Sequence, residues 1–582
     1  MRSFRCKSLL IVLLWVSIAP AGCARGEAES PFAKELDRYL NALAGYGYSG
    51  AVLVAMHDKV VLDKGYGLAD RAKGTPFTAD TLFDIASISK PFTAAVVLRL
   101  EMQGKLNAAD PLSRFFPEAP ADKAAITLHQ LLTHTSGLPE SMGPEYEPLT
   151  REAALKRIFA TPLVHPPGGR FLYSNVGYSV LAAVVEVVTG KPFGEVLKSE
   201  VLVPAGMQHS GYHPSAEDRA RLAHGYAVGG GDWGTPLDHP WAPDGPWWNL
   251  RGNGGVLTTT GDLYRFHVAL KGDKVLSSAA RAEYQQPKVP ETHTPWPKYS
   301  YGWSVAKSPT EHFMLSHVGD NGIFQSDYRR FPDDGAVIAV DTNTADYSAI
   351  AVAQQIELRL FGKPFVTPPP VVPVKEAELR RCAGTYELSP GEPLEVVAEP
   401  NRLVITPVGS EGMALVSGKP EEKRRRRFAD RESEVAEALE AELHGDSAPL
   451  NRLLVGGTAD GAKRWHDSLA AAKAELGAWK GATVLGTRSL GGQVLTHARV
   501  TFEKGERVMD VVWSGPMVDS LWLVPRLRPS YFLPEGPSRF ATFDVGTAAI
   551  VHLTCAGEGA AAELRFDTPG GVVKAKRRPT GS

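Results

Sequence analysis

Two Ser-x-x-Lys tetrads are the first residues in this chain whose types and spacing could do chemistry. They are Ser87-Ile-Ser-Lys90 and Ser304-Val-Ala-Lys307. A serine hydroxyl is a weak nucleophile, which a neighbouring base can activate for attack on a carbonyl carbon. Ser304 lies in a strand-like stretch, where residues three apart point to opposite faces. Only the first tetrad can therefore bring its amine to its hydroxyl, provided that it lies on a helix.

The stretch that follows the first tetrad is predicted to be a helix. Its apolar residues recur at helical spacing, and the run stops at Gly104. Pro91 fits only in or near the first turn, so the helix should begin close to Ser87. Positions i and i+3 share one face of a helix, which lets the Lys90 amine reach the Ser87 hydroxyl. The unpaired amides of the first turn also offer donors to an oxyanion, although an ordinary N-cap serine gives the same local pattern.

Two further segments carry polar residues where a substrate could reach them. Tyr173-Ser-Asn175 opens a helical run after the Gly168-Gly169 turn, where a short polar loop should be exposed. Leu315-Ser-His317-Val-Gly319 ends a strand-like run, and its glycine would let a substrate backbone approach closely. Taken singly, each is also what an ordinary turn or strand end contains.

Together and in this order, the three segments resemble the penicillin-recognising serine hydrolases: class C β-lactamases, DD-peptidases and related esterases. The stretches Phe83–Ser87, Leu131–Leu138 and Gly254–Asp262 are similar to the same family. The resemblance covers about residues 30–365. It implies an α+β fold of the β-lactamase/DD-peptidase type, in which an antiparallel sheet is flanked by helices and joined to an all-helical lobe.

By this resemblance, Ser87 attacks a carbonyl carbon and forms an acyl-enzyme that water then hydrolyses. Either Tyr173 or Lys90 is the base. Ionising a tyrosine of ordinary pKa at pH 7 costs about 4 kcal/mol, and a neutral lysine needs a pKa shift of similar size, so the sequence leaves both assignments open. Asn175 would hold the substrate amide or the lysine.

The same resemblance places the oxyanion between the backbone amides of Ser87 and of Asp320, the residue after Gly319. His317 would contact the substrate. A histidine of ordinary pKa is only about one quarter protonated at pH 7, so it offers a hydrogen bond but little fixed charge. Since Asp320 also repels anions, the site should favour neutral esters or amides over penicillins and cephalosporins.

The predicted function is therefore a serine hydrolase, an esterase or peptidase, acting on a small-molecule or peptide substrate. Two alternatives stay open: a true β-lactamase, and a non-catalytic peptidoglycan-sensing or binding module on the same fold. No cofactor or metal is expected, because the chain has no H-E-x-x-H and its histidines lack ligand spacing. The glycines of Gly45–Gly50 match G-x-G-x-x-G, but a helix precedes them and a strand follows, the reverse of a dinucleotide site.

Composition narrows the class further. The 582 residues carry 63 Lys and Arg against 65 Asp and Glu, a formal charge of −2, which argues against a nucleic-acid partner. The chain is 43% hydrophobic and 22% charged, an ordinary globular mixture, and its four cysteines are too few for a disulfide scaffold. Its length predicts more than one domain.

The N-terminus predicts export. Arg2, Arg5 and Lys7 precede a short apolar run over 9–18, too short to span a bilayer. Ala21-Gly22-Cys23 resembles the cleavage box of a bacterial lipoprotein, although Pro20 departs from it. We therefore expect a lipoprotein-type signal peptide over 1–23 with Cys23 as the lipid attachment site; the alternative is a plain secretory signal. The mature protein would be periplasmic or membrane-anchored, touching the membrane only through that lipid.

Residues 366–374 are Pro-rich and predict a stiff linker between two parts. The hydrolase domain, over 30–365, should contain helices near 32–43, 90–103, 151–160 and 175–188, and strands near 51–55, 60–62, 299–306, 312–318 and 336–341. Residues 375–582 predict a β-rich module with a helical insert at about 430–525. Cys382 and Cys555 in this module are either a disulfide or two buried thiols. Four tryptophans between 233 and 248 either wall an acyl pocket or hold a long loop.

Overall fold

The computed structural model describes residues 30–579 except 228–229, 292–295, 390–391, 419–421, 455–458, 515–516 and 558. The predicted signal peptide and Cys23 lie outside the described residues. Within that part of the chain, no helix is both long and apolar enough to cross a membrane. The same residues contain no group of three or more His, Cys, Asp or Glu side chains placed to hold a metal ion.

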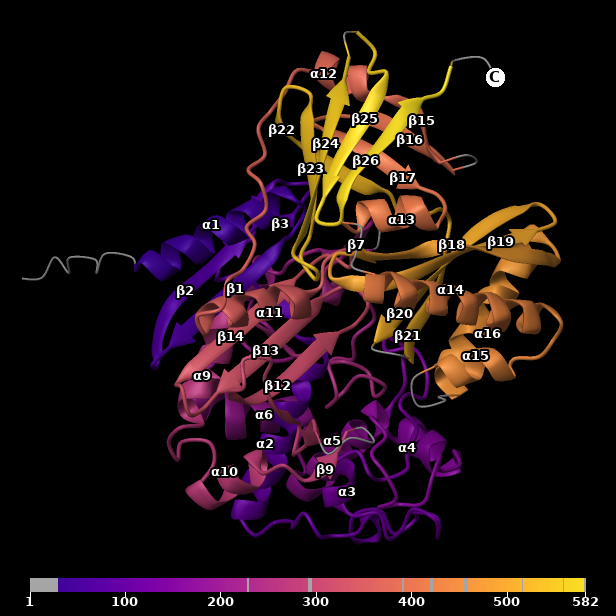
Figure 1. Cartoon of the computed structure of the whole chain (residues 1–582). Coiled ribbons are helices and arrows are strands. Elements are labelled where there is room, and N and C mark those ends of the chain that lie inside the picture. The colour runs from indigo at the N-terminus through magenta and orange to yellow at the C-terminus, as the bar shows by residue number, and fades with distance from the viewer. Residues whose placement is uncertain are drawn as a thin grey trace, which may run out of the picture.

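An eight-stranded antiparallel sheet forms the centre of the first domain (Figure 1). Its strands follow the order β2-β1-β14-β13-β12-β11-β10-β9. Their bounds are β1 (Gly50–Met56), β2 (Lys59–Tyr66), β9 (Val289–Pro290), β10 (Lys298–Tyr299), β11 (Ser304–Lys307), β12 (Phe313–Asp320), β13 (Gln325–Phe331) and β14 (Ala336–Thr342). The N-terminal hairpin therefore pairs with the last strand of the domain, which closes the domain on itself.

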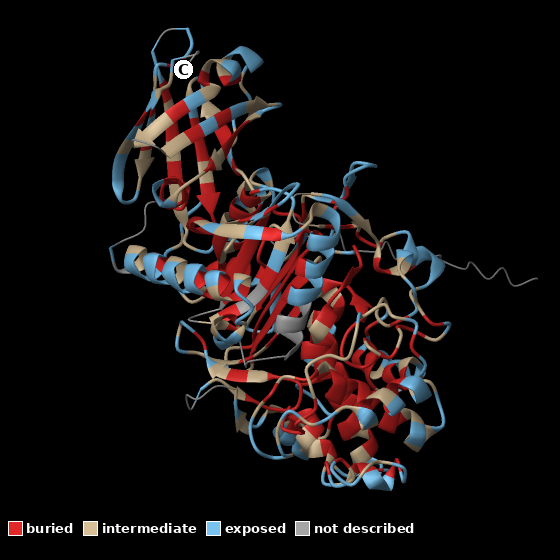
Figure 2. Cartoon of the chain, turned by 90° about the vertical axis from the view of Figure 1, so that its right-hand side faces the viewer, coloured by how far each residue is buried: buried red, intermediate tan, exposed pale blue. Residues whose placement is uncertain are grey.

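Helices cover both faces of this sheet, which explains why β1 and β14 are mostly apolar and buried on both faces. Val52 and Val54 of β1 share a buried cluster with α1 (Pro31–Gly45) and α11 (Ala349–Leu360). The alternate residues Leu53 and Ala55 pack on the other side with α2 (Ser89–Met102) and α9 (Thr260–Ala269). In Figure 2 the sheet and the helices against it form the buried centre of the molecule.

A mainly helical lobe continues from α2 on this second side. Its helices are α3 (Leu128–Leu132), α4 (Arg151–Ala160), α5 (Asn175–Thr189), α6 (Phe193–Leu197), α7 (Val203–Ala205), α8 (Ala216–Arg219) and α10 (Ser278–Gln285). Short strands tie its loops together: β3 (Leu68–Asp70), β4 (Thr75–Pro76), β5 (Phe83–Asp84), β6 (Gly225–Tyr226), β7 (Asp232–Gly234) and β8 (Leu257–Thr258). The antiparallel sheet, its helices and the helical lobe confirm the fold expected from the sequence.

Two strand predictions differ from the structure. Residues 299–306 are not one strand, because a turn at Gly302, with φ of 78°, separates β10 from β11. Strand β13 was not predicted, since Asp327 and Arg329 give it a polar pattern although all of its residues are buried. The Arg329 guanidinium forms ion pairs with the Asp327 carboxylate at 2.6 Å and with the Glu357 carboxylate of α11 at 2.7 Å. Paired charges allow a polar segment to occupy a central position.

The C-terminal module is built around a closed barrel of eight strands (Figure 1, upper part). The barrel strands are β15 (Gly384–Ser389), β16 (Glu392–Glu399), β17 (Arg402–Pro407), β22 (Ser530–Gly536), β23 (Arg539–Asp544), β24 (Ala549–Ala556), β25 (Glu563–Thr568) and β26 (Gly571–Arg577), preceded by α12 (Glu376–Cys382).

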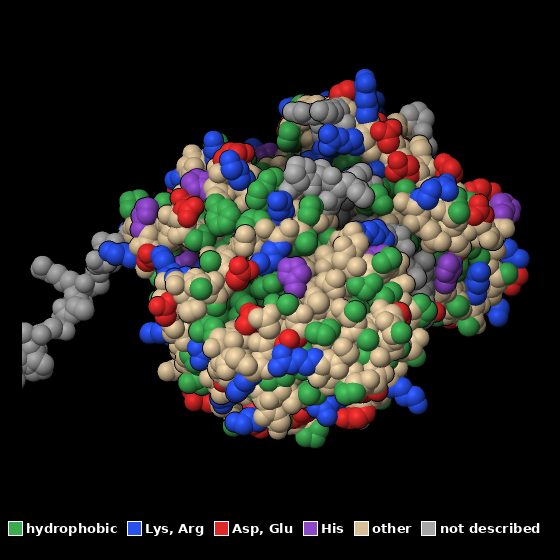
Figure 3. All heavy atoms as spheres, turned by 90° about the horizontal axis from the view of Figure 1, so that it is seen from below, with side chains coloured by type: hydrophobic (Ala, Val, Ile, Leu, Met, Phe, Trp, Pro, Cys, Tyr) green, Lys and Arg blue, Asp and Glu red, His purple; other side chains and the backbone are tan. Residues whose placement is uncertain are grey.

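On the face shown in Figure 3, acidic and basic side chains are interspersed over the molecule rather than gathered by sign.

The insert interrupts the barrel between β17 and β22. It consists of α13 (Ser410–Val416), α14 (Glu422–Leu443), α15 (Ala448–Leu453) and α16 (Ala459–Leu476), followed by β18 (Trp479–Leu490), β19 (Gln493–Phe502), β20 (Gly505–Ser514) and β21 (Met517–Val524). The insert thus begins earlier than the expected residue 430, and a four-stranded antiparallel sheet makes up its second half. Alternating apolar residues of that sheet pack against α14 and α16, so the insert has its own core.

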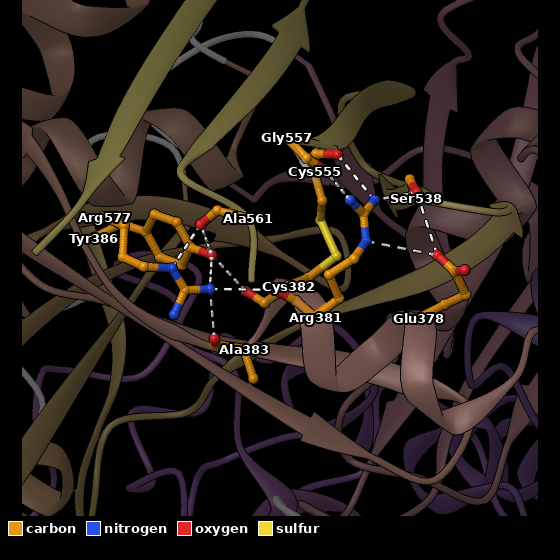
Figure 4. The surroundings of a disulfide bond; sticks show 10 residues. All are labelled: Glu378, Arg381, Cys382, Ala383, Tyr386, Ser538, Cys555, Gly557, Ala561 and Arg577. Atoms are coloured by element: carbon orange, nitrogen blue, oxygen red, sulfur yellow. Dashed lines mark hydrogen bonds and ion pairs between the residues drawn. A yellow bond between two sulfur atoms is a disulfide. The ribbon is translucent and has the colours of Figure 1, made fainter. Parts of the chain in front are cut away.

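Cys382 and Cys555 form a disulfide (Figure 4), which is one of the two alternatives that the sequence left open for this pair. The bond joins the end of α12 to strand β24, which are 173 residues apart in the chain. Beside it, the Arg381 guanidinium donates to the Cys555 and Gly557 carbonyl oxygens. The disulfide therefore fastens α12 to the barrel.

The barrel and the hydrolase domain share one apolar cluster. Phe543 and Val545, beside the β23–β24 turn, are buried with residues of α1 and α11. The ring of Phe543 lies 6.3 Å from that of Tyr46 in an edge-to-face contact. The turn between β18 and β19 adds a backbone contact, in which Ser348 N donates to Gly491 O at 2.9 Å.

These contacts allow a prediction for a chain that ends at Phe365. All site residues identified from the sequence precede the linker, so this shortened chain should still hydrolyse p-nitrophenyl acetate. It should unfold at a temperature several degrees lower than the full chain, because Tyr46 and its neighbours lose their apolar cover. Circular dichroism melting and initial rates test both parts. A folded, soluble truncation without activity would show that the C-terminal module completes the site.

Candidate active site

Ser87 lies in a 3-10 turn, Ala86–Ile88, that runs directly into α2. The Lys90 amine, one turn along, lies 2.9 Å from Ser87 Oγ and donates to the carbonyl oxygen of Asn253 at 3.0 Å. Lys90 is fully buried, whereas Ser87 is half-buried. The contact predicted from the Ser-x-x-Lys spacing is thus present, and Ser304 lies in strand β11 as expected.

The turn that presents Ser87 is held in an uncommon backbone conformation. Ala86 has φ of 43°, in the left-handed region that a residue with a Cβ rarely adopts. The buried Asp84 carboxylate accepts from Ala86 N at 2.8 Å and from Asn321 Nδ2 at 3.2 Å. Asp84 therefore joins the Ser87 turn to the loop after β12 and positions the hydroxyl.

Burial controls the charge of Lys90. Removal from water lowers the pKa of its amine to about 7, against a partial opposing effect of Glu145 and Glu140. Near neutral pH a substantial fraction of Lys90 is therefore the free amine, which can accept a proton.

Tyr173 lies beside this pair. The Lys90 amine is 4.7 Å from the centre of the Tyr173 ring. Burial raises the pKa of the Tyr173 hydroxyl above its ordinary value, although a hydrogen bond with Ser87 opposes the rise. The phenol is consequently neutral at physiological pH.

His134 supports Tyr173 from behind. Its ring packs on the Tyr173 ring at 4.5 Å, and its Nδ1 accepts from Ser174 N at 3.0 Å. Burial, Lys90 and His317 all hold the pKa of His134 far below its usual value, so this ring is uncharged.

Asn175 is the first residue of α5, whose N-cap is Ser174. Its backbone N donates to Glu140 O at 2.8 Å, which attaches the helix to the loop that follows α3. The side-chain Oδ1 is buried and has no hydrogen-bond partner among the described residues. An acceptor left in this state is available to a donor on a bound molecule.

His317, the residue expected to contact the substrate, forms hydrogen bonds within the protein. Its Nδ1 donates to Val318 O at 2.7 Å. Its Nε2 lies 3.1 Å from the Tyr299 hydroxyl oxygen and can accept a hydrogen bond from that hydroxyl. Burial, followed by the charge of Lys90, lowers the pKa of His317 to about 3. The ring is thus neutral at physiological pH, and the protein itself uses both of its nitrogens.

Gly319 brings strand β12 against the Ser87 turn. A Cβ at this position would lie 2.1 Å from the carbonyl oxygen of Ile85, so only glycine allows this approach. Asp320 follows at the end of the strand; its side chain is exposed, and its Oδ1 accepts from Gly322 N at 2.6 Å. The amides of β12 and of the Ser87 turn are therefore close neighbours.

Trp233, the first tryptophan of the tryptophan-rich stretch, packs among aromatic rings from other loops. Trp233 of β7 stacks on His239 at 3.7 Å, and the ring of Tyr146 lies 4.9 Å from the same histidine. Trp233 also contacts Phe324, which follows β12, at 6.1 Å. These four rings, Tyr146, Trp233, His239 and Phe324, form an aromatic cluster that links the loop after α3, β7 and the loop after β12.

Sequence reasoning did not assign several residues of this site. Asp84 and His134 lie inside stretches that had been recognised as family-like, but nothing local indicates their partners. Asn253 contributes only its carbonyl oxygen, and Glu145 stands in a loop without any motif. Only the folded chain brings these groups to Ser87.

Comparison with known proteins agrees with this geometry. The model of the family described as Beta-lactamase matches residues 36–360. A penicillin-binding protein of Bacillus subtilis is 27% identical over 393 residues, which cover 63% of this chain and 86% of that protein. Esterase EstB of Burkholderia gladioli is 37% identical over 191 residues, 29% of this chain and about half, 48%, of the esterase.

A solved structure extends the likeness of fold to nearly the whole chain. The octameric penicillin-binding protein homologue from Pyrococcus abyssi superposes with a TM-score of 0.51 at 17% identity, covering 93% of this chain and 99% of that one. The family match spans more than half of the sequence and contains every site residue discussed above. This chain therefore belongs to the β-lactamase family and is a serine hydrolase.

Proposed function

We propose that this enzyme cleaves an ester or amide bond through an acyl-enzyme on Ser87, with Lys90 as the base. The observation that carries the proposal is the 2.9 Å contact between a fully buried lysine amine and the Ser87 hydroxyl. Donation from Lys90 to Asn253 O aligns the amine, so that its lone pair can face Ser87 when the amine is neutral. The pKa of Lys90, about 7, matches a base that works near neutral pH.

Acylation would proceed as follows. Ser87 gives its proton to Lys90 Nζ while Oγ forms a bond to the carbonyl carbon. The amides of Ser87 and Asp320 would hold the oxyanion, a role that the contact of Gly319 with Ile85 supports by bringing the two segments together. When the intermediate collapses, the bond to the leaving group breaks and that group takes the proton.

Tyr173 would relay protons rather than act as the resting base. Its neutral hydroxyl contacts Ser87 and can pass the Lys90 proton to the leaving group. In deacylation the same groups would take a proton from water, whose oxygen attacks the acyl carbon and returns Ser87 to its free form. Asn175 would orient the substrate through the buried Oδ1 that lacks a partner among the described residues.

The proposed substrates are neutral or non-carboxylate esters and amides. A β-lactam carries a carboxylate beside the scissile bond, and His317 supplies no charge to bind it because its pKa is about 3. A true β-lactamase is therefore the less favoured alternative. A non-catalytic peptidoglycan-binding module would not require the buried Lys90 beside Ser87, and desolvating that lysine costs stability.

Covalent labelling tests the proposal directly. A fluorophosphonate probe followed by peptide mapping should place the adduct on Ser87, and Ser87→Ala should abolish labelling. Ser304→Ala is the matched control, since it removes the serine of the other Ser-x-x-Lys tetrad and should label normally. A folded wild type that neither labels nor hydrolyses any ester would favour the binding module.

The pH profile tests the assignment of the base. Lys90 is active when deprotonated, and its pKa is about 7. The value of kcat/KM should therefore be low at pH 5, rise through neutrality and level off above pH 8, by the usual titration of one base. Initial rates with a short-chain p-nitrophenyl ester give the profile. If kcat/KM instead stays low through neutrality and rises only above pH 10, ionisation of Tyr173 supplies the base.

A substitution at His317 tests substrate choice. The wild type should strongly prefer a short-chain p-nitrophenyl ester to nitrocefin. His317→Lys should shift the ratio of kcat/KM toward nitrocefin by about tenfold, the effect of one added charge near the substrate carboxylate. Both substrates are measured at pH 8. Efficient nitrocefin hydrolysis by the wild type at that pH would contradict the argument.

We also propose that the protein is exported and carries a lipid on Cys23. The Cys382–Cys555 disulfide supports an oxidising compartment, where such bonds persist. Palmitate labelling in a bacterial host should mark the wild type and not Cys23→Ser. A wild type that is exported but takes up no palmitate would mean that the leader is a plain secretory signal.

A further inference from the structure

His134 holds the segment that carries Tyr173 at both of its ends. The backbone N of Leu172 donates to the carbonyl oxygen of His134 at 2.8 Å. The backbone N of Ser174 donates to Nδ1 of the His134 ring at 3.0 Å. These two bonds engage the residue before Tyr173 and the residue after it, so one residue fixes the whole stretch 172–174.

The His134 ring also packs on the Tyr173 ring itself. The two ring centres lie 4.5 Å apart, with their planes tilted by 34°. On its other sides the His134 ring contacts Tyr178 at 5.1 Å and Tyr299 at 4.7 Å. The Tyr299 hydroxyl in turn lies 3.1 Å from His317 of β12. His134 thus connects the segment that carries Tyr173 with α5 and with the central sheet.

The backbone of His134 is held in an uncommon conformation. Its φ is 57°, in the left-handed region that few residues with a Cβ adopt. In this conformation its carbonyl oxygen and its ring reach the same segment, as the bonds to Leu172 and Ser174 show. Backbone outliers of this kind persist where the surrounding structure determines them, and they are concentrated at functional sites.

The bond from Ser174 limits what the imidazole can do. Because Nδ1 accepts from a backbone N–H, it carries no proton, and the proton of the neutral ring lies on Nε2. Nε2 is buried and has no hydrogen-bond partner among the described residues. The residue as a whole is fully buried, so it does not touch a substrate. Any part that His134 has in the reaction must therefore pass through Tyr173.

We infer that His134 is a positioning residue, whose bond from Ser174 holds the Tyr173 hydroxyl where it can deliver a proton to the leaving group. The inference rests on the proposed function, in which Tyr173 relays that proton. As the intermediate collapses, the bond from the acyl carbon to the leaving oxygen breaks, and this oxygen takes the phenol proton. Tyr173 regains a proton from the Lys90 ammonium, which received it from Ser87.

This role predicts a dependence on the leaving group. p-Nitrophenolate is a stable anion and departs without a proton, whereas ethoxide must be protonated as it leaves. A displaced Tyr173 hydroxyl should therefore slow the hydrolysis of ethyl butyrate far more than that of p-nitrophenyl butyrate. The two esters share their acyl group, so a general loss of active enzyme cancels in the ratio of their kcat/KM values. Phenyl butyrate, whose leaving group is intermediate, should show an intermediate loss.

Two substitutions in the full-length protein isolate the acceptor of His134. His134→Gln can place an amide nitrogen near the position of Nε2 but has no acceptor at that of Nδ1. His134→Asn has an oxygen there and tolerates a positive φ. At pH 8, His134→Gln should lower kcat/KM about a hundredfold for ethyl butyrate and less than about tenfold for p-nitrophenyl butyrate, as expected when a general acid is misplaced. His134→Asn should keep the wild-type ratio within about threefold. Release of butyric acid in a pH-stat gives the rates.

His267→Gln is the matched control. His267 of α9 is also fully buried, and its Nδ1 accepts from Arg330 at 3.2 Å, so the substitution removes an equivalent acceptor elsewhere in the domain. It should lower the melting temperature and leave the ratio unchanged. Tyr173→Phe should change the ratio at least as much as His134→Gln does. The double variant should have the ratio of Tyr173→Phe alone, because the two residues act as one unit.

The outcomes separate the inference from the proposed function. Equal slowing of all three esters in His134→Gln, a selective loss as large in His134→Asn, or additive changes in the double variant would each overturn the inference. A Tyr173→Phe variant with the wild-type ratio would instead refute the relay, and hydrolysis that survives Ser87→Ala would refute the acyl-enzyme. If His134→Gln does not fold, His134→Phe, which keeps an aromatic ring without an acceptor, replaces it with the same expected ratio.

Discussion

Replacing Lys90 with methionine should lower kcat/KM by about a thousandfold or more, because Ser87 loses the base that takes its proton. The same substitution should raise the free energy of unfolding. Folding lowers the pKa of the Lys90 amine from 10.5 to about 7, so at pH 7 the folded state holds fewer protons than the unfolded state and is penalised for it. Methionine has similar length and no charge to desolvate.

The expected gain in the free energy of unfolding at pH 7 is about 2 kcal/mol. It is the desolvation cost that methionine avoids, less the stabilisation lost with the hydrogen bond from Lys90 to Asn253 O. The gain has a defined pH dependence. Since the pKa of Lys90 is lowered on folding, the penalty is largest below pH 7 and disappears as the pH approaches 10.5. Denaturant melts of both proteins at pH 7 and pH 10 measure it.

Ser87→Ala is the control for this substitution, since it should abolish activity without stabilising the fold to the same extent. Two results would contradict the assignment of Lys90 as a buried base. One is a Lys90→Met variant with activity near that of the wild type. The other is an inactive variant that is less stable than the wild type at pH 7, which would mean that the amine is charged and well paired in the folded protein.

Gly319→Ala should reduce kcat about a hundredfold or more with little change in KM, the effect typical of displacing an oxyanion donor. The new Cβ would stand 2.1 Å from Ile85 O, so strand β12 and the Ser87 turn must move apart. That movement separates the amides of Ser87 and Asp320, which serve the transition state more than the bound substrate.

Steady-state kinetics with a p-nitrophenyl ester measure this loss, and circular dichroism confirms that the variant is folded. Gly272→Ala is the matched control, because a Cβ there meets nothing within 4 Å and it should behave as the wild type. A Gly319→Ala variant with kcat within about threefold of the wild type would show that β12 does not supply an oxyanion donor.

The sequence determined those parts of the protein that depend on local geometry. The Ser87–Lys90 contact follows from helix periodicity, since residues three apart share a face wherever the helix is placed. The helices that became α1, α2, α4 and α5 were predicted from the sequence; in α1 the apolar residues at helical spacing are the ones that the fold buries. The order of the motifs also indicated the family, which the match over residues 36–360 confirms.

Strand β13 and the insert show where local reasoning fails. In β13 the apolar pattern is broken by Asp327 and Arg329, and their burial makes sense only once Glu357 arrives from α11. In the insert, helical stretches were expected at 430–443 and near 462–479, where α14 and α16 lie, but the sheet of β18–β21 that covers these helices was not assigned. Both cases depend on partners that lie elsewhere in the chain.

Only the tertiary structure decided the electrostatics of the site. The pKa of Lys90 depends on burial among segments such as Asn253, which is 163 residues away in the chain. The neutrality of His317 depends on desolvation and on its contact with Tyr299. The conformation of the Ser87 turn depends on a hydrogen bond between Asp84 and Asn321, which are 237 residues apart in the chain. A sequence specifies which groups can ionise; the energy of each ionised form is set by the solvent and charges that the fold places around it.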